Sequence, residues 1–110
     1  MTMKIPKSFK LFGTTINIVW DNLRMNDVHA FGLFEYAKSQ ITLANKDGID
    51  DISEDKILDT FYHEKVHAIL TLMRERDLSD NEKFVDVFAK LLRQADETSN
   101  YEQCDKFYPS

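Results

Sequence analysis

The sequence has little cysteine, glycine or proline, and it has no long hydrophobic run. Its 110 residues include one cysteine, three glycines and two prolines. Cys104 alone forms no disulfide within the chain and completes no Cys-x-x-Cys motif, so any metal ligands must be histidine or carboxylate side chains. With 43% hydrophobic residues, the composition excludes collagen-like and disordered chains. No apolar stretch approaches the roughly 20 residues that span a bilayer, so we expect no membrane partner.

Basic residues are also scarce. Fourteen Lys and Arg oppose nineteen Asp and Glu, which gives a formal net charge of -5. Binding to nucleic acid without sequence preference needs a basic face that replaces phosphate counterions, so we expect no nucleic-acid partner. Residues 1–10 lack the continuous apolar segment of a secretory signal, which predicts a cytoplasmic protein.

The first half of the chain has the pattern of β-strands. Residues 14–20 are rich in β-branched side chains, and residues 9–11 just before them alternate with period two, which predicts a bent strand or a hairpin. Residues 31–36 and 40–44 flank a short polar connection of hairpin length. The polar segment 21–28 predicts a loop. Together these segments predict a small antiparallel sheet of about three strands.

The second half has the 3.6-residue period of two helices, after a turn-rich linker at 45–52. Ser53 is a good N-cap for a first helix that extends as far as Arg74 and Arg76. Ser79 is the expected start of a second helix that ends near Ala95. Its expected buried face is apolar and comprises Phe84, Val87, Phe88, Leu91 and Leu92.

These elements predict an α+β fold in which the sheet packs on both helices. A single domain at 1–95 contains all of them, and the polar residues at 96–110 predict a C-terminal tail. The exposed edges of a small sheet allow two chains to pair, so monomer and dimer are both open alternatives.

The first predicted helix contains an H-E-x-x-H motif, His63-Glu64-Lys65-Val66-His67. Residues four apart lie on one helix face about 5–6 Å apart, so both imidazoles reach one zinc ion at about 2.0–2.1 Å. Glu64 lies about 100° around the helix. From there its carboxylate accepts a proton from a water in the open position of the ion. The alternative is a pair of ordinary surface or core histidines.

A catalytic zinc usually has three protein ligands and one water. Glu82 is the best candidate for the third ligand, because fifteen residues after His67 leave enough chain for the second helix to turn back across the first. His29, in a predicted loop, is another candidate. Glu75 is poorly placed, about 12 Å along the same helix by rise. The alternative for Glu82 is a capping box with Ser79, in which it satisfies backbone donors.

Asp86 follows Glu82 by four residues, on the same helix face. Its carboxylate is placed to accept the second N–H of a ligating histidine, and we expect that histidine to be His63. The alternative for Asp86 is a solvated surface charge.

With these residues the chain resembles the gluzincin family of zinc metallopeptidases, in which a glutamate on a following helix completes an H-E-x-x-H site. The resemblance is strongest to the minigluzincins and to SprT-like and ImmA/IrrE-type domains. It identifies 61–70 as the active-site helix and 82–92 as the glutamate helix. The resemblance implies a zincin-like fold with one Zn2+ per chain on three ligands, His63, His67 and Glu82.

The function that this resemblance implies is peptide-bond hydrolysis by a zinc metalloendopeptidase, through a zinc-bound water that Glu64 activates. A peptide or protein substrate would lie along the edge strand of the sheet. Lys65, where such enzymes usually have an uncharged residue, is expected to point into solvent. The sequence places no group that stabilises the oxyanion: His29, Tyr36, Tyr101 and Tyr108 are candidates, and the alternative for each is a structural or surface role. The alternative is an interaction module of the same fold, zinc-binding or metal-free, with little or no catalytic activity.

Overall fold

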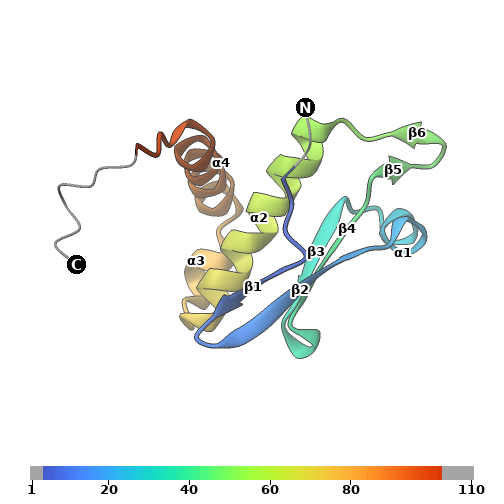
Figure 1. The fold of residues 1–110 in the computed structure, drawn as a ribbon. Helices are drawn as coiled ribbons and strands as arrows, with labels where there is room; N and C mark the ends of the chain where they lie inside the picture. Colours follow the sequence, from blue (N-terminus) through green and yellow to red (C-terminus); the bar gives the residue numbers. More distant parts are fainter. Residues whose placement is uncertain (1–3, 103–110) are drawn as a thin grey trace, which may run out of the picture.

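A four-stranded mixed sheet forms one side of the protein in the computed structural model, which describes residues 4–102 (Figure 1). The strands are β1 (Ser8–Leu11), β2 (Thr14–Trp20), β3 (Gly32–Glu35) and β4 (Gln40–Leu43). Their order in the sheet is β1-β2-β4-β3, so β3 lies at an edge. The β1–β2 and β3–β4 pairs are antiparallel, whereas β2 and β4 are parallel.

The α+β class is confirmed, but the expected antiparallel sheet of about three strands is wrong in its strand count and its topology. The first segment, expected to be a bent strand or a hairpin, forms the hairpin β1–β2, and the predicted hairpin β3–β4 also forms. The two hairpins join through the parallel pair β2–β4. The segment expected to be a loop contains helix α1 (Asn22–Asp27), capped by Asp21, whose carboxylate accepts the Arg24 N–H at 3.0 Å. This helix joins the end of β2 to the start of β3 on the far side of β4, and β3 then runs back, so that β4 starts beside β2 and runs parallel to it.

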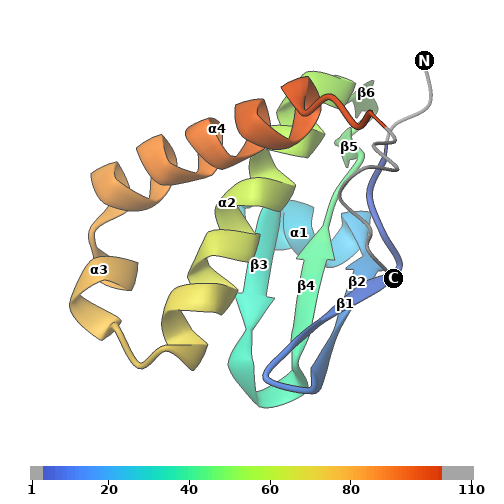
Figure 2. The same ribbon diagram turned by 60° about the vertical axis from the view of Figure 1, so that its left-hand side comes forward.

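Helix α2 (Glu54–Leu72) lies between the sheet and helix α4 (Glu82–Thr98), as Figures 1 and 2 show. Its predicted N-cap is confirmed, since the Ser53 hydroxyl accepts the Lys56 N–H at 3.1 Å. One core joins α2 to the sheet and comprises Ile16, Ile41, Leu43 and Phe61. A second core joins α2 to α4 and comprises Val66, Leu70, Val85 and Ala89.

The start of the second predicted helix differs from the expectation. Ser79 lies in a short helix, α3 (Arg76–Asp80), and α4 begins after it. Asn81 caps α4, because its side-chain oxygen accepts the Phe84 N–H at 3.1 Å. Helix α4 continues past the predicted boundary at residue 95, and most of the predicted tail lies outside the described residues.

The expected buried face of α4 is right in part, since Phe84 and Leu92 pack against the core between α2 and α4, but it is wrong for the other three residues. Val87, Phe88 and Leu91 are 49%, 47% and 62% exposed, whereas Val85 and Ala89 are buried against α2. Arg93 of α4 binds Asp55 of α2 at 2.9 Å and Asp59 of α2 at 2.8 Å, so ion pairs join the two helices beside their apolar core.

Two further features complete the fold. The predicted linker forms a two-stranded hairpin of β5 (Lys46–Asp47) and β6 (Asp50–Asp51). Gly32 lets β3 approach α2 closely, because a Cβ at this position would lie 2.6 Å from Thr60 Cγ2. Within residues 4–102, no helix has both the length and the apolarity that a membrane crossing requires.

Candidate metal centre

Three side chains from two helices converge on one point. His63 Nε2 lies 3.0 Å from one carboxylate oxygen of Glu82, and His67 Nε2 lies 3.3 Å from the other. One ligand atom from each residue can be chosen so that all three lie within 4.8 Å of one another. Zinc bonds of about 2.0–2.1 Å in a tetrahedron separate the ligand atoms by about 3.3 Å. The two nitrogens and the carboxylate could therefore hold a metal ion.

Local sequence explains why these side chains meet. His63 and His67 are one turn apart on α2, with ring centroids 4.9 Å apart. The Asn81 cap starts α4 at Glu82, so this carboxylate lies at the first residue of a helix that crosses α2. Further along α4, Arg93 anchors the helix to α2. The predicted ligand set is thus brought together, and Glu82 has no capping-box role, because Asn81 supplies the cap.

Ser79 contacts one of the two histidines. Its hydroxyl lies 2.9 Å from His67 Nδ1, and His67 is mostly buried, with 18% of its side chain exposed. In the tautomer in which Nδ1–H donates to this hydroxyl, Nε2 is free to bind a metal and points toward Glu82. Sequence reasoning missed this contact, because it used the serine as a helix cap.

Glu64 lies beside the three ligands and is only 9% exposed. One of its carboxylate oxygens, Oε1, accepts the backbone N–H of Phe34 at 2.8 Å, so the edge strand β3 holds this side chain. Burial raises the pKa of Glu64, while the neighbouring His67 side chain and the Phe34 N–H act in the opposite direction. The backbone donor has no sequence signature, so the motif alone gave no sign of this contact.

Two hollows flank the site along β3. One has a volume of about 430 Å³ and includes Leu33, Phe34, His67 and Ser79 in its lining. The other has a volume of about 280 Å³ and includes Phe31, Gly32, Lys56, Asp59 and Lys90. His63 and Glu64 line both hollows. The candidate metal centre therefore has open space on both sides, in the direction of the edge strand.

Asp86 does not have the contact that the sequence predicted. Its carboxylate accepts a hydrogen bond from Lys90 at 2.9 Å, and among residues 4–102 it makes none with His63. The Lys90 ammonium holds the pKa of Asp86 below its ordinary value. Asp86 and His63 do line the same hollow. Lys90 lies one turn further along α4, so its ammonium reaches Asp86 and binds the carboxylate that we expected to orient His63.

Lys65 also differs from the expectation of a solvated side chain. Its ammonium lies over three aromatic rings, at 5.3 Å from the centroid of Phe9, 5.7 Å from Phe61 and 5.5 Å from Tyr62. These cation–π contacts place Lys65 on the face of α2 that lies against β1. The Lys65 ammonium therefore packs on aromatic rings instead of extending into solvent.

The remaining candidates lie away from the cluster. His29 is exposed in the turn after α1, and the ligand group found within residues 4–102 does not include it. Tyr36 and Tyr101 are 62% and 88% exposed, and neither lines the two hollows. Tyr108 and Cys104 lie outside the described residues. None of the described candidates for oxyanion stabilisation is therefore at the site.

The side chains of His63, His67 and Glu82 lie close enough to hold one metal ion. Glu64 lies next to them and binds the Phe34 N–H, and the Ser79 hydroxyl contacts His67 Nδ1. The likeness to gluzincins remains a prediction from the motif. Comparison with protein-family models, with curated proteins and with solved structures found no match.

Proposed function

We propose that this protein is a zinc-dependent metallopeptidase that holds one ion on His63, His67 and Glu82. The observation that carries the proposal is the approach of both imidazole Nε2 atoms to one carboxylate, at 3.0 Å and 3.3 Å. Two nitrogens and one oxygen leave a fourth position open, which is typical of a catalytic zinc. When bound, zinc is a Lewis acid that lowers the pKa of water and polarises a carbonyl group.

Glu64 is the proposed general base and acid. It takes the proton of the attacking water and later delivers it to the amine of the departing product. Its Oε1 is bound to Phe34, while Oε2 makes no hydrogen bond within the described part of the chain. No buried side-chain oxygen in this part lacks a partner, so Oε2 is accessible to a water in the hollows.

The free edge of β3 is the proposed substrate-binding element. Phe31 C=O accepts from Ala44, so in the antiparallel ladder the alternate residues Gly32 and Phe34 direct their N–H and C=O groups away from β4. An extended peptide can pair with these groups as an added strand beside the metal ligands. It would compete with Glu64 for the Phe34 N–H and so release the carboxylate toward the water.

Substitution of Glu64 and Glu82 separates catalysis from metal binding. Glu64→Gln should retain one zinc per chain and reduce the rate of peptide cleavage by about 100- to 10,000-fold, the contribution of a general base. Glu82→Ala should weaken zinc binding. Glu75→Gln is the matched control, because this exposed glutamate lies outside the ligand cluster. Metal content and cleavage of a broad quenched-peptide library are measured on all of them.

Two outcomes would overturn parts of this proposal. Full activity in Glu64→Gln would remove its assignment as general base. A wild-type protein that holds one zinc but cleaves nothing in the library would favour the alternative, a zinc-binding interaction module without catalytic activity.

A further inference from the structure

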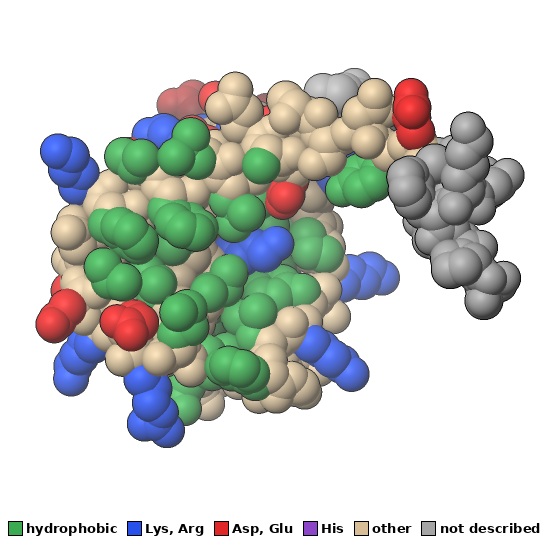
Figure 3. Space-filling view, turned by 90° about the vertical axis from the view of Figure 1, so that its left-hand side faces the viewer, with side chains coloured by type: hydrophobic (Ala, Val, Ile, Leu, Met, Phe, Trp, Pro, Cys, Tyr) green, Lys and Arg blue, Asp and Glu red, His purple; other side chains and the backbone are tan. Residues whose placement is uncertain are grey.

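An apolar face surrounds Lys65 on the side of α2 that lies away from the candidate metal centre. Lys65 follows His63 by two residues, which places the two side chains about 200° apart around the helix. The Lys65 ammonium lies over the rings of Phe9, Phe61 and Tyr62. Figure 3 views the molecule from the left-hand side of Figure 1 and shows hydrophobic side chains gathered beside α4. The face is therefore separate from the metal ligands.

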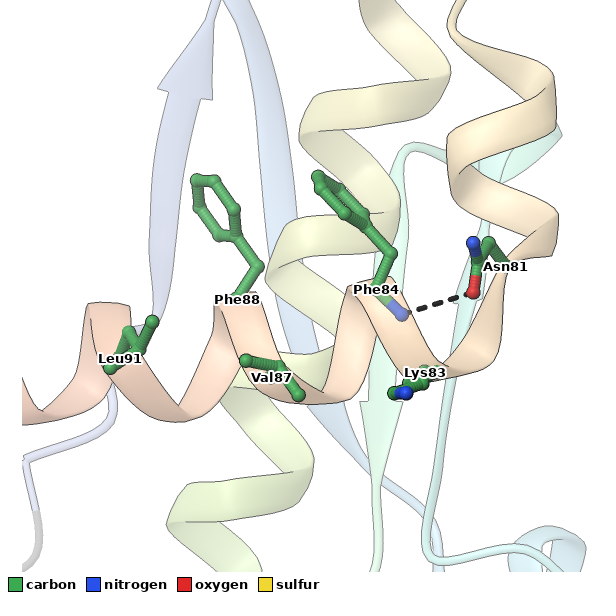
Figure 4. A pocket seen from close by; sticks show the side chains of 6 residues that line it. All are labelled: Asn81, Lys83, Phe84, Val87, Phe88 and Leu91. Atoms are coloured by element: carbon green, nitrogen blue, oxygen red, sulfur yellow. Dashed lines mark hydrogen bonds between the residues drawn. The ribbon is translucent and has the colours of Figure 1, made fainter.

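Helix α4 adds apolar side chains to this face. Phe84 and Tyr62 both pack against the core between α2 and α4, and the ring centroid of Phe84 lies 5.7 Å from that of Phe88. The two phenylalanine rings point to the same side of α4 (Figure 4), and a hollow of about 420 Å³ includes both of them and Leu91 in its lining. Phe88 is 47% exposed and Leu91 is 62% exposed. We call this surface the Lys65 face, and its members are Phe9, Tyr62, Lys65, Phe84, Phe88 and Leu91.

Lys65 is the charged member of this face, and it has no carboxylate partner in the part of the chain that the structure describes. None of the ion pairs among residues 4–102 includes Lys65. Asp96 lies beside Tyr62, but its carboxylate accepts the Tyr62 hydroxyl at 2.8 Å. A segment that covers the face takes the Lys65 ammonium out of water, and burying an unpaired charge is costly. The occupant should therefore bring a carboxylate together with apolar side chains.

The segment that follows α4 has this chemistry and reaches the face. Residues 103–110 lie outside the described part of the chain and include one aspartate and two aromatic residues. The hydrogen bond between Tyr62 and Asp96 places the last turn of α4 beside the face, and α4 ends at Thr98. The seven residues from Thr98 to Asp105 span up to about 25 Å when extended. This length lets the chain turn back along α4 as far as the Lys65 face.

We propose that residues 103–110 cover the Lys65 face, with the Asp105 carboxylate bound to the Lys65 ammonium. In an extended segment alternate side chains point to the same side, so Phe107 packs on the face together with Asp105 while Lys106 points into solvent. The Phe107 ring covers exposed apolar side chains of α4. This docking leaves the metal ligands open, because they lie on the opposite side of α2. The proposal does not depend on zinc or on peptidase activity.

Paramagnetic relaxation in the full chain tests the proposal, because Cys104 is the only cysteine and takes one nitroxide label beside the proposed contact. The label should broaden the amide signals of Lys65 and Phe88. The amide of Leu23 is the internal reference and should stay sharp, because α1 lies across the sheet from α4 (Figures 1 and 2). In the unlabelled chain, Phe107→Ser should shift the Lys65 and Phe88 signals. Broadening that is confined to the last turn of α4, or a Phe107→Ser variant without these shifts, would overturn the proposal.

Charge variants test the pair between Asp105 and Lys65. Asp105→Asn should lower the ratio of docked to undocked chains about 2- to 5-fold, the contribution of one partly exposed ion pair. Lys106→Gln is the matched control, since it removes a charge from the adjacent residue and should leave the broadening unchanged. Lys65→Glu and Asp105→Lys should each weaken the broadening, and the double variant should restore it, because the pair forms again with reversed sign. Losses that simply add in the double variant, or equal broadening in Asp105→Asn and wild type, would also overturn the proposal.

Discussion

The contact between β3 and α2 leads to a prediction about Gly32→Ala. A Cβ at Gly32 would lie 2.6 Å from Thr60 Cγ2 and 3.0 Å from Leu43 Cδ2. Carbon atoms in contact are normally about 3.5–4.0 Å apart. Alanine therefore forces β3 away from α2 or moves the Thr60 side chain, and such overpacking costs about 1–3 kcal/mol of the free energy of unfolding.

A second substitution tests whether the Thr60 methyl group, Cγ2, is the group that clashes with the new Cβ. Thr60→Ser removes Cγ2 and keeps the hydroxyl, which donates to the Lys56 carbonyl at 2.8 Å. Alone it should cost about 1 kcal/mol for the lost methyl group. In Gly32→Ala/Thr60→Ser the shortest contact is gone, so the double variant should be more stable than the sum of the single losses by about 1–2 kcal/mol.

Urea unfolding followed by circular dichroism measures these free energies. The matched control is Gly13→Ala with Thr60→Ser, since a Cβ at Gly13 meets nothing within 4 Å and its cost comes from a φ of +77°. This second pair should be additive. Gly32→Ala as stable as wild type, or a pair with Thr60→Ser that is additive too, would refute the close approach of β3 to α2.

Two further predictions concern the metal centre and the edge strand. Ser79→Ala should lower zinc affinity about 10- to 100-fold in competition with a chelating dye, because His67 loses the partner that orients its ring; Ser79→Thr keeps the hydroxyl and should stay near wild type, and unchanged affinity in the alanine variant would contradict this role. Arg24 binds Glu35 through two hydrogen bonds of 2.6 Å and 2.9 Å and holds the pKa of this carboxyl below its ordinary value. The pair's contribution, about 1 kcal/mol, is therefore present at pH 7 and is lost as the pH falls below about 4.5. The difference in unfolding free energy between wild type and Glu35→Gln should be constant from about pH 7 to about pH 5 and shrink below that, whereas a loss above pH 5 would exclude this pair as the cause.

Local sequence patterns predicted the parts of the fold that depend on neighbouring residues. The two hairpins and the Ser53 cap of α2 form as expected, because turn residues and caps act within a few positions. The parallel pairing of β2 with β4 was not predictable in this way. It depends on contacts between residues far apart in the chain, which alternation within each strand does not encode.

The rotation of α4 is a second case in which local pattern was misleading. Its strongest apolar stripe predicted the buried face, yet the smaller residues Val85 and Ala89 are the ones fully buried against α2. Of the predicted residues, only Phe84 and Leu92 pack beside them. Hydrophobic periodicity identifies a face that avoids water but does not say which partner covers it.

The candidate site was predictable as far as its residue types and spacing determine it. His63 and His67 share one face of a helix by geometry alone, and Glu82 follows where a crossing helix brings it back. The hydrogen bonds around the site were not predictable, because the sequence does not determine which partner Ser79 or Asp86 binds. Ser79 binds His67 and Asp86 binds Lys90, a choice that only the packed structure makes.

Zinc titration of metal-free protein, with X-ray absorption spectroscopy of the product, tests the central claim most directly. The account predicts one zinc per chain, with two imidazole nitrogens and carboxylate oxygen at about 2.0–2.2 Å, and a large loss of affinity in His67→Ala and Glu82→Ala. A protein that binds no zinc at stoichiometric concentrations, or binds it equally well without His67 and Glu82, would contradict the account.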